Sequence, residues 1–288
     1  MRHLQITHTT TYEYSEIVTL QPHRLLLRPR EGHDLRIESS QLEITPAHMI
    51  KWQRDVYGNS VGIVQFLERS KQLSIFSGIT LKHYEDQPLD FWVEDYAVNF
   101  PFQYDPVERI DLSPYVVPIF LDDQPAIGEW LRKFWQPGQV VETYLLLDWI
   151  NKALANNFTY CMREEPGVQT PGETLSIQGG SCRDYATLFI EACRYFGLAA
   201  RFVSGYLYSP ETVLGDGSTH AWSEVYLPGA GWKGFDSTSG LVVGNDHIAV
   251  AVHRHPEEIP PVSGTFLAAH QLAPNMRVTV QVVETEVF

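Results

Sequence analysis

The spacing of apolar residues changes once along this chain, and that change constrains the fold more than any other feature. From residue 1 to about residue 89 apolar and polar residues alternate, which is typical of strands that bury one face. The alternating pairs include Leu4 and Ile6, Leu35 and Ile37, Leu42 and Ile44, and Leu73 and Ile75. Turn-forming residues separate them at 30–33, 45–46 and 57–59. This half is predicted to be an antiparallel, β-sandwich-like domain.

Helical spacing replaces this alternation in the second half. Prolines recur between residues 88 and 118, and this composition suits an ordered connector more than a regular element. Apolar residues then repeat at helical intervals over 127–134, 147–158 and 182–196, and alternation returns in 200–208, 221–227, 232–236, 248–252 and 276–282. We therefore expect an α+β protein with two domains. Residues 1–110 would form the β domain with its connector, and residues 111–288 would pack helices on an antiparallel sheet.

The charge and the cysteine content limit which partners and which cellular compartment are expected for this protein. The 288 residues carry 21 lysines and arginines against 35 aspartates and glutamates, a formal charge of −14, which repels nucleic-acid phosphates and anionic lipids. Neither nucleic acid nor a membrane is therefore expected as a partner. No apolar run approaches the roughly 18 residues of a membrane span, and no signal-peptide core follows the first residues, so we expect a cytoplasmic protein. Three cysteines without a C-x-x-C pair indicate neither a disulfide framework nor a zinc ribbon.

Residues 178–186 have the features of a nucleophile site. Two glycines and Ser181 precede Cys182, the first residue of the third predicted helix. A thiol at a helix N-terminus lies near unpaired N–H groups and the positive end of the helix dipole, and both favour the thiolate. The glycines let the backbone approach the sulfur, so the Cys182 N–H can donate to an oxyanion. The spacing alone fits an inert buried cysteine equally well.

Residues 219–236 are predicted to form a β-hairpin that supplies a histidine and a carboxylate. A turn centred on Pro228 places His220 directly opposite Asp236, and a turn centred on Gly229 makes them diagonal neighbours about 7–8 Å apart. In either arrangement the carboxylate fixes the tautomer of the histidine. Cys182, His220 and Asp236 together are the side chains needed for covalent acyl transfer, although each taken alone fits a structural role.

Four ordered sequence words resemble those of the transglutaminase-like superfamily, specifically its bacterial transglutaminase-like enzymes and cysteine proteases. They are Gly180-Ser181-Cys182-Arg183-Asp184-Tyr185-Ala186, Arg201-Phe202-Val203-Ser204-Gly205-Tyr206, His220-Ala221-Trp222-Ser223-Glu224-Val225-Tyr226 and Gly231-Trp232-Lys233-Gly234-Phe235-Asp236. The first half also resembles the β domain that precedes the core in this group, through residues 11–14, 23–30 and 55–59. The resemblance therefore spans nearly the whole chain.

This resemblance implies a papain-like α+β core with Cys182 as nucleophile, His220 as general base and acid, and Asp236 as the orienting carboxylate. We expect no cofactor and no metal. Asp184 also matches the family word, and its first-turn position suits compensation of the helix dipole. The family usually has proline after the aspartate, where this chain has Ser237. A further departure is His253-Arg254-His255-Pro256, where the substrate surface is expected to differ from that of the family.

Several other residues compete for functional roles. Gln178 and Tyr160 are both candidates for a second oxyanion donor, although each also fits a structural role. Cys161 and Cys193 are expected to be inert and packed. The histidines at 247, 253 and 255 invite a zinc interpretation because two of them share a strand face. Without a third ligand of defined position, the sequence does not favour a metal site.

The predicted function is acyl transfer through a thioester on Cys182, with an amide of a peptide or protein, including a glutamine-type amide, as substrate. Hydrolysis is favoured because no lysine-docking or calcium-binding acidic motif is apparent. Two alternatives remain. One is an amine-transferring transglutaminase, and the other is a catalytically silent peptide-binding module with the same fold.

Overall fold

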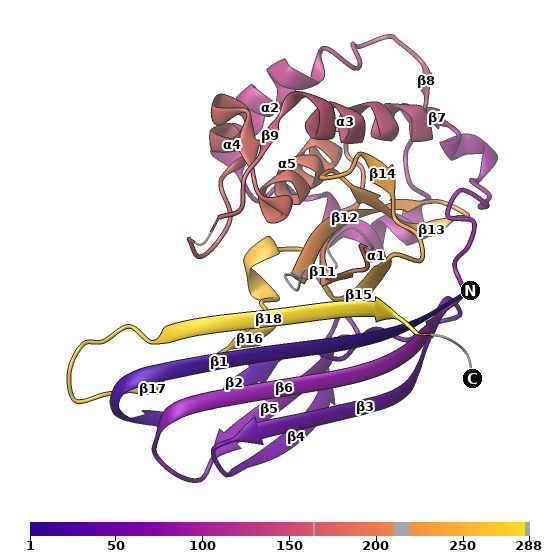
Figure 1. Cartoon of the computed structure of the whole chain (residues 1–288). Coiled ribbons are helices and arrows are strands. Elements are labelled where there is room, and N and C mark those ends of the chain that lie inside the picture. Colours follow the sequence, from indigo (N-terminus) through magenta and orange to yellow (C-terminus); the bar gives the residue numbers. More distant parts are fainter. Residues whose placement is uncertain (164, 210–218, 286–288) are drawn as a thin grey trace.

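The computed structural model describes residues 1–163, 165–209 and 219–285. The strands of the N-terminal half form one layered unit, and a second sheet lies between this unit and a group of helices (Figure 1). This arrangement confirms the predicted α+β class. Within the described part of the chain, no helix combines the length and the apolar content required to cross a bilayer.

Two antiparallel sheets make up the N-terminal domain. The first has the strand order β17-β1-β6-β3 with β18 also paired to β1, and the second has the order β16-β2-β5-β4. The strands are β1 (Arg2–Leu20), β2 (His23–Leu25), β3 (Leu35–Thr45), β4 (His48–Arg54), β5 (Ser60–Phe66), β6 (Ser70–His83), β16 (Val262–Ser263), β17 (Phe266–Leu267) and β18 (Asn275–Glu284). Val18 and Leu73 of the first sheet share a buried cluster with Leu25 and Val64 of the second. The predicted β-sandwich-like domain is therefore present.

The last strand does not belong to the domain in which the sequence division placed it. Alternation over 276–282 correctly indicates a strand, and the expected boundary assigned it to the second domain at 111–288. In the structure β18 pairs antiparallel with β1 along its length, with Ile6 opposite Val282 and Thr10 opposite Val278. Figure 1 shows this yellow strand lying beside the indigo N-terminal strand. Periodicity identifies a strand but not its partner, so the chain's return to the first domain could not be read from this pattern.

The connector contains a helix that its composition did not predict. Short elements η1 (Asp95–Ala97) and β7 (Asn99–Phe100) lead into α1 (Pro106–Val116), and η2 (Leu121–Asp123) follows. The Asp105 carboxylate accepts the N–H of Val107 at 2.9 Å, and Pro106 occupies the first turn, where a missing N–H costs nothing. Pro106 therefore marks a helix start inside the segment that was predicted to be an ordered connector without a regular element.

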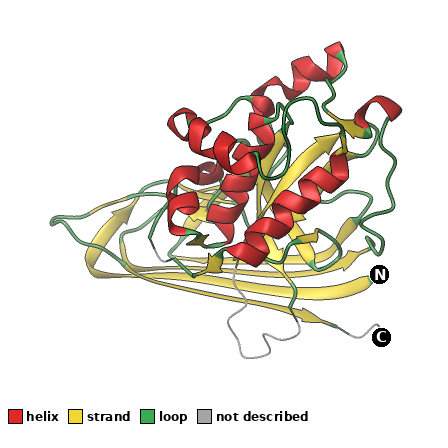
Figure 2. Ribbon diagram, turned by 90° about the horizontal axis from the view of Figure 1, so that it is seen from above, coloured by secondary structure: helices red, strands yellow, loops and turns green. Residues whose placement is uncertain are grey.

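The second domain packs helices on a five-stranded antiparallel sheet of order β14-β13-β12-β11-β15. Its sheet strands are β11 (Ala200–Leu207), β12 (Thr219–Leu227), β13 (Gly231–Asp236), β14 (Leu241–Val242) and β15 (His247–His253). The remaining elements are α2 (Gln124–Leu131), β8 (Val141–Glu142), α3 (Thr143–Asn157), β9 (Thr159–Tyr160), α4 (Pro171–Ile177), β10 (Gly179–Gly180), α5 (Cys182–Tyr195) and η4 (Pro256–Glu258). Figure 2 shows the helices gathered on one side of the strands. The predicted helices-on-sheet core is thus confirmed.

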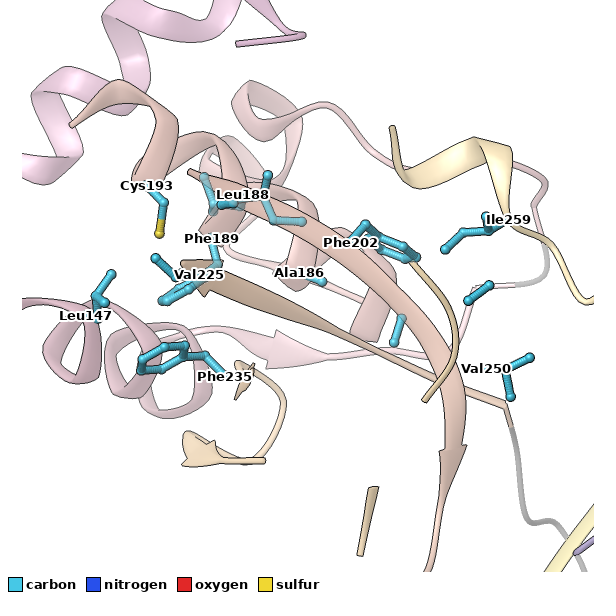
Figure 3. Packing of buried hydrophobic residues seen from close by; sticks show 14 of the residues in the cluster. Leu147, Ala186, Leu188, Phe189, Cys193, Phe202, Val225, Phe235, Val250 and Ile259 are labelled. Carbon is cyan, nitrogen blue, oxygen red and sulfur yellow. The ribbon is translucent and has the colours of Figure 1, made fainter. Parts of the chain in front are cut away.

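Helix α5 is the central element of this layer. Its residues 184–194 are all buried, and the Phe189 ring stacks on Phe235 of β13 with centroids 5.4 Å apart (Figure 3). The Ser223 hydroxyl of β12 also donates to the Ala186 carbonyl at 3.0 Å. These contacts fix the helix against the two strands that carry His220 and Asp236.

We expect Phe189→Ala to lower the free energy of unfolding by about 3–5 kcal/mol, because it leaves a cavity between helix and sheet. Phe189→Leu, which keeps most of the volume, should cost less than about 1.5 kcal/mol. Urea denaturation followed by tryptophan fluorescence measures both variants. Equal losses would show that this contact does not hold α5 on the sheet.

Candidate active site

Cys182 is placed by a tight approach of backbone segments. The strand β10, immediately before the helix, pairs in parallel with β9, so that Gly180 lies beside Tyr160. A Cβ atom on Gly180 would come within 2.9 Å of both the Asp184 Cβ and the Gln169 Oε1, so only glycine fits without displacing neighbours. The approach brings Cys182, the first residue of α5, to a partly exposed position. Its N–H is at a helix position that has no intrahelical acceptor.

Asp184 fixes the start of this helix from inside the protein. One carboxylate oxygen accepts the Ser181 N–H and hydroxyl at 2.8 and 2.7 Å. The other accepts the Gln169 N–H at 2.7 Å and pairs with Arg163 at 2.7 Å. The side chain is completely buried. Asp184 therefore ties the loop at 163–169 to the helix turn that carries the nucleophile, which agrees with a structural rather than a proton-transfer role.

His220 and Asp236 meet as diagonal neighbours. The hairpin pairs Leu227 with Gly231 and Ser223 with Phe235, so its centre is Gly229, and the register centred on Pro228 is wrong. A three-residue connection at 228–230 sets this register. Gly229 within it and Gly231, the first residue of β13, are both in the left-handed region. The second arrangement allowed by the sequence is the observed one, and His220 Nε2 lies 3.2 Å from Asp236 Oδ2.

The electrostatics of this pair favour a charged imidazole beside an ionised carboxylate. Burial opposes the charge on His220, but the neighbouring Asp236 carboxylate and Cys182 sulfur outweigh it and raise the pKa of His220 to about 10. Burial likewise opposes ionisation of Asp236, yet hydrogen bonds from His220 and His247 hold the pKa of this carboxyl far below its usual range. The structure therefore brings His220 and Asp236 together beside Cys182, and the catalytic roles of these three residues stay a prediction.

His247 is a fourth member of this group that sequence reasoning did not place there. His247 is the first residue of β15, and its Nε2 atom lies 3.3 Å from Asp236 Oδ2. The His247 side chain is only 8% exposed. The sequence grouped His247 with His253 and His255. In the structure the His253 ring Nδ1 accepts the backbone N–H of His255 at 2.9 Å, and the His253 ring packs on Tyr57. The pairing of β15 with β11 brings His247 into the site, and no local pattern encodes that pairing.

His220, Asp236 and His247 also form a possible metal-ligand group. Their ligand atoms lie within 4.8 Å of one another, and imidazole with carboxylate is a ligand set that zinc accepts. An ion bound there would take His220 Nε2 and Asp236 Oδ2, the two atoms that pair in the proposed triad. Metal binding at this group and the histidine–aspartate pair are therefore mutually exclusive.

A cleft of about 580 Å³ opens in front of the thiol, with Cys182, His220 and Tyr160 among its lining residues. Its volume lies within the range of small-molecule and substrate sites. Tyr160 lies beside Cys182 in this cleft, and burial together with the neighbouring sulfur raises the pKa of Tyr160 to about 12. The Tyr160 hydroxyl therefore stays neutral and protonated beside the thiol. Gln178, the other oxyanion candidate, has an exposed side chain and does not line this cleft.

The other two cysteines differ from each other. Cys193 is completely buried in the core, as expected, and burial raises the pKa of its thiol well above the ordinary range. Cys161 was expected to be packed, but it is exposed. The reason is that the chain leaves α3 at Asn157 and continues as the short strand β9, so Cys161 is not on the buried face of a helix.

Two family models match the chain. The bacterial transglutaminase-like N-terminal region matches residues 4–81, and the transglutaminase-like superfamily matches residues 142–237. Both matched models are transglutaminase-like, so the chain is similar to that superfamily in both of its halves. Cys182, His220 and Asp236 all lie within the second match.

Relatives of this transglutaminase-like protein extend over most of the chain. An uncharacterized protein of Mycobacterium tuberculosis (strain ATCC 25618 / H37Rv) is 28% identical over 287 residues, which cover 90% of this chain and 86% of the relative. One from Mycobacterium leprae (strain TN) is 23% identical over 274 residues, covering 92% and 94%. A crystal structure described as a "putative cysteine protease" from Cytophaga hutchinsonii matches with a TM-score of 0.73 and 20% identity, over 100% of this chain and 92% of that chain. The two-domain fold is thus shared with a solved protein.

The raised pKa of His220 links stability to pH. Histidine has a pKa near 6.5 when unfolded, and that of His220 is about 10 in the fold. A group whose pKa rises on folding stabilises the protein fully below its unfolded pKa, and this contribution is lost as the pH rises through the folded pKa. The stability advantage of the wild type over His220→Gln should therefore be largest near pH 6 and shrink between about pH 6.5 and pH 10. Urea denaturation at constant ionic strength measures it, and a pH-independent difference would contradict this ionisation.

Proposed function

We propose that this protein is a cysteine-dependent acyl-transfer enzyme that hydrolyses an amide of a peptide or protein through a thioester on Cys182. The observation that carries the proposal is the buried His220 ring, which lies 3.2 Å from the Asp236 carboxylate and lines the same open cleft as Cys182. Such a connected nucleophile, base and orienting acid is what covalent acyl transfer requires.

The first half of the reaction forms the thioester. The Cys182 thiolate attacks the carbonyl carbon of the amide, and the carbonyl oxygen becomes an oxyanion. The Cys182 N–H at the start of α5 and the Tyr160 hydroxyl are the donors proposed to stabilise this charge. Protonated His220 then gives its proton to the leaving amine as the C–N bond breaks. Asp236 stays ionised throughout and holds the ring in position.

The second half of the reaction returns the enzyme to its starting state. Neutral His220 takes a proton from water, and the hydroxide equivalent attacks the thioester carbonyl. The second oxyanion collapses, the C–S bond breaks, and the carboxylic acid leaves while Cys182 regains the thiolate beside protonated His220. Transfer to a primary amine would follow the same path, with the amine in place of water.

Selective alkylation tests the thiol. At pH 7 we expect iodoacetamide to modify Cys182 at least about 10-fold faster than Cys161, because only the first is paired with an imidazole. Cys161 is an exposed thiol in the same molecule and serves as the internal control. His220→Ala should remove the difference. Peptide mapping by mass spectrometry gives both rates, and equal rates in the wild type would favour the silent peptide-binding module.

A turnover assay tests whether water or a primary amine accepts the acyl group from the thioester. Incubation of a glutamine-containing peptide with a fluorescent primary amine should release ammonia faster than amine is incorporated, as expected for a hydrolase. A panel of peptide amides and acyl esters extends the search if glutamine is not the substrate. Cys182→Ala should abolish every activity without loss of folding. Amine incorporation that exceeds ammonia release would favour a transglutaminase, and an active Cys182→Ala variant would overturn the proposal.

The metal-ligand group of His220, Asp236 and His247 supports a second candidate, a structural zinc protein. Metal analysis of the purified protein separates the two candidates. Stoichiometric zinc that a chelator removes with loss of folding would favour the metal site, because an ion there prevents His220 from pairing with Asp236. A folded protein with little metal and a reactive Cys182 would favour the enzyme.

A further inference from the structure

The N-terminal domain covers an otherwise free edge of the sheet that carries the site. In the core sheet β15 is an edge strand, paired only with β11 among the described strands. Its outer edge receives hydrogen bonds from the first domain at three points. The His83 ring contacts the His247 carbonyl at 3.2 Å, the Arg30 N–H donates to the Ala249 carbonyl at 2.8 Å, and Asn59 pairs with Val252. These contacts occupy polar groups that an uncovered edge would leave unpaired.

Asn59 makes the most specific of these contacts. Its amide donates to the Val252 carbonyl and accepts the Val252 N–H, both at 2.9 Å, as a paired strand would. The side chain is completely buried, and its orientation is fixed by Asp55 at 2.9 Å and by Arg30 at 2.7 Å. Asp55, Asn59 and Arg30 of the first domain therefore form a hydrogen-bonded group that binds the edge of β15.

His83 acts at the end of β15 nearest the site. A carbonyl only accepts hydrogen bonds, so the Nε2 atom that faces the His247 carbonyl is the protonated one. The His83 Nδ1 atom accepts the N–H of Glu85 at 3.4 Å, which is consistent with the same tautomer. Arg2 of β1 also contacts the preceding residues, at 3.0 Å to Asn245 and 3.1 Å to Asp246. The backbone leading into His247 is thus held from the first domain.

The His247 side chain then reaches the site from this fixed backbone. Its ring packs edge-on against Trp222, with centroids 5.2 Å apart, and Nε2 lies 3.3 Å from Asp236 Oδ2. The same oxygen lies 3.2 Å from His220 Nε2. Asp236 is therefore bound on one side by the proposed catalytic histidine and on the other by a histidine that does not line the cleft of Cys182.

We propose that His247 is a positioning residue for Asp236, and that the N-terminal domain holds His247 in place by covering the edge of β15. The inference rests on the proposed function, since it assigns a role relative to the His220 pair. The Nε2–H of His247 donates to Asp236 and restrains its carboxylate in the orientation that pairs with His220. The β domain thereby contributes to the reactivity of Cys182 through the position of His247.

Two substitutions at His247 test the side chain. His247→Gln keeps an N–H donor at about the position of Nε2, whereas His247→Leu has a similar size and no donor. The rate of Cys182 alkylation by iodoacetamide at pH 7 should fall about 10-fold or more in His247→Leu and recover most of the wild-type rate in His247→Gln. Circular dichroism and the unfolding midpoint check that both variants fold. Wild-type rates in both variants, or equal losses in two folded variants, would overturn the role of the donor.

A measurement on the unaltered protein keeps the test independent of variant folding. Nitrogen-15 NMR of the histidine rings reports which nitrogen carries the proton, and we expect the Nε2–H tautomer at His247. An Nδ1–H tautomer would place a lone pair opposite the carboxylate and overturn the inference. If wild-type Cys182 is no more reactive than Cys161, the proposed function itself fails. If Cys182 is reactive but its rate does not change in the His247 variants, only the role of His247 fails.

A pair of substitutions in the first domain tests the link between domains. His83→Ala removes the contact to the His247 carbonyl, and His48→Ala is a matched control because the His48 ring contacts only its local Pro46 carbonyl among the hydrogen bonds of the described residues. We expect His83→Ala to slow Cys182 alkylation severalfold and His48→Ala to leave the rate unchanged. Equal rates in the two folded variants would show that the first domain does not position the site.

Discussion

The site depends on Asp236, because two imidazole rings, those of His220 and His247, lie against the same buried carboxylate oxygen. An ionised carboxylate inside a protein is costly unless hydrogen bonds and opposite charge compensate it. Here His220, His247 and the Ser239 hydroxyl surround Oδ2, and the Thr238 N–H binds Oδ1. These partners come from β12, β15 and the turn after β13. The order of strands in the core sheet is therefore a condition for the charge on Asp236, and that charge in turn supports the protonated His220.

A second buried carboxylate has a different task. Asp184 binds backbone and side-chain donors of the segment before α5 and pairs with Arg163, so it fixes where the helix begins. The thiol of Cys182 lies at that start, and its distance from His220 depends on the packing of α5 against β12. One acid thus positions the nucleophile, and the other orients the base. Both are needed because sulfur and imidazole come from different layers of the fold.

The sequence predicted the parts of the site that short-range patterns encode. Cys182 could be found because glycines and a helix start lie beside it, and His220 and Asp236 because one hairpin carries both. The turn allowed two registers, and only the backbone at Gly229 and Gly231 decides between them. The strand over 276–282 was recognised by alternation, but its partner β1 is some 270 residues away along the chain (Thr10 opposite Val278). Helix α1 was not predicted, because the prolines were taken as a sign of irregular structure and the capping role of Asp105 before Pro106 was not considered.

His247 shows why the remainder required coordinates. Its neighbours in sequence give it a strand and a face, but its contact with Asp236 depends on β15 pairing with β11, a long-range choice. That choice leaves β15 at the edge of the sheet, where unpaired N–H and C=O groups invite wrong pairing. Asn59, Arg30 and His83 of the first domain satisfy several of these groups. A site residue on an edge strand is only as well positioned as the surface that covers that edge, which gives a physical reason for the two domains to occur in one chain.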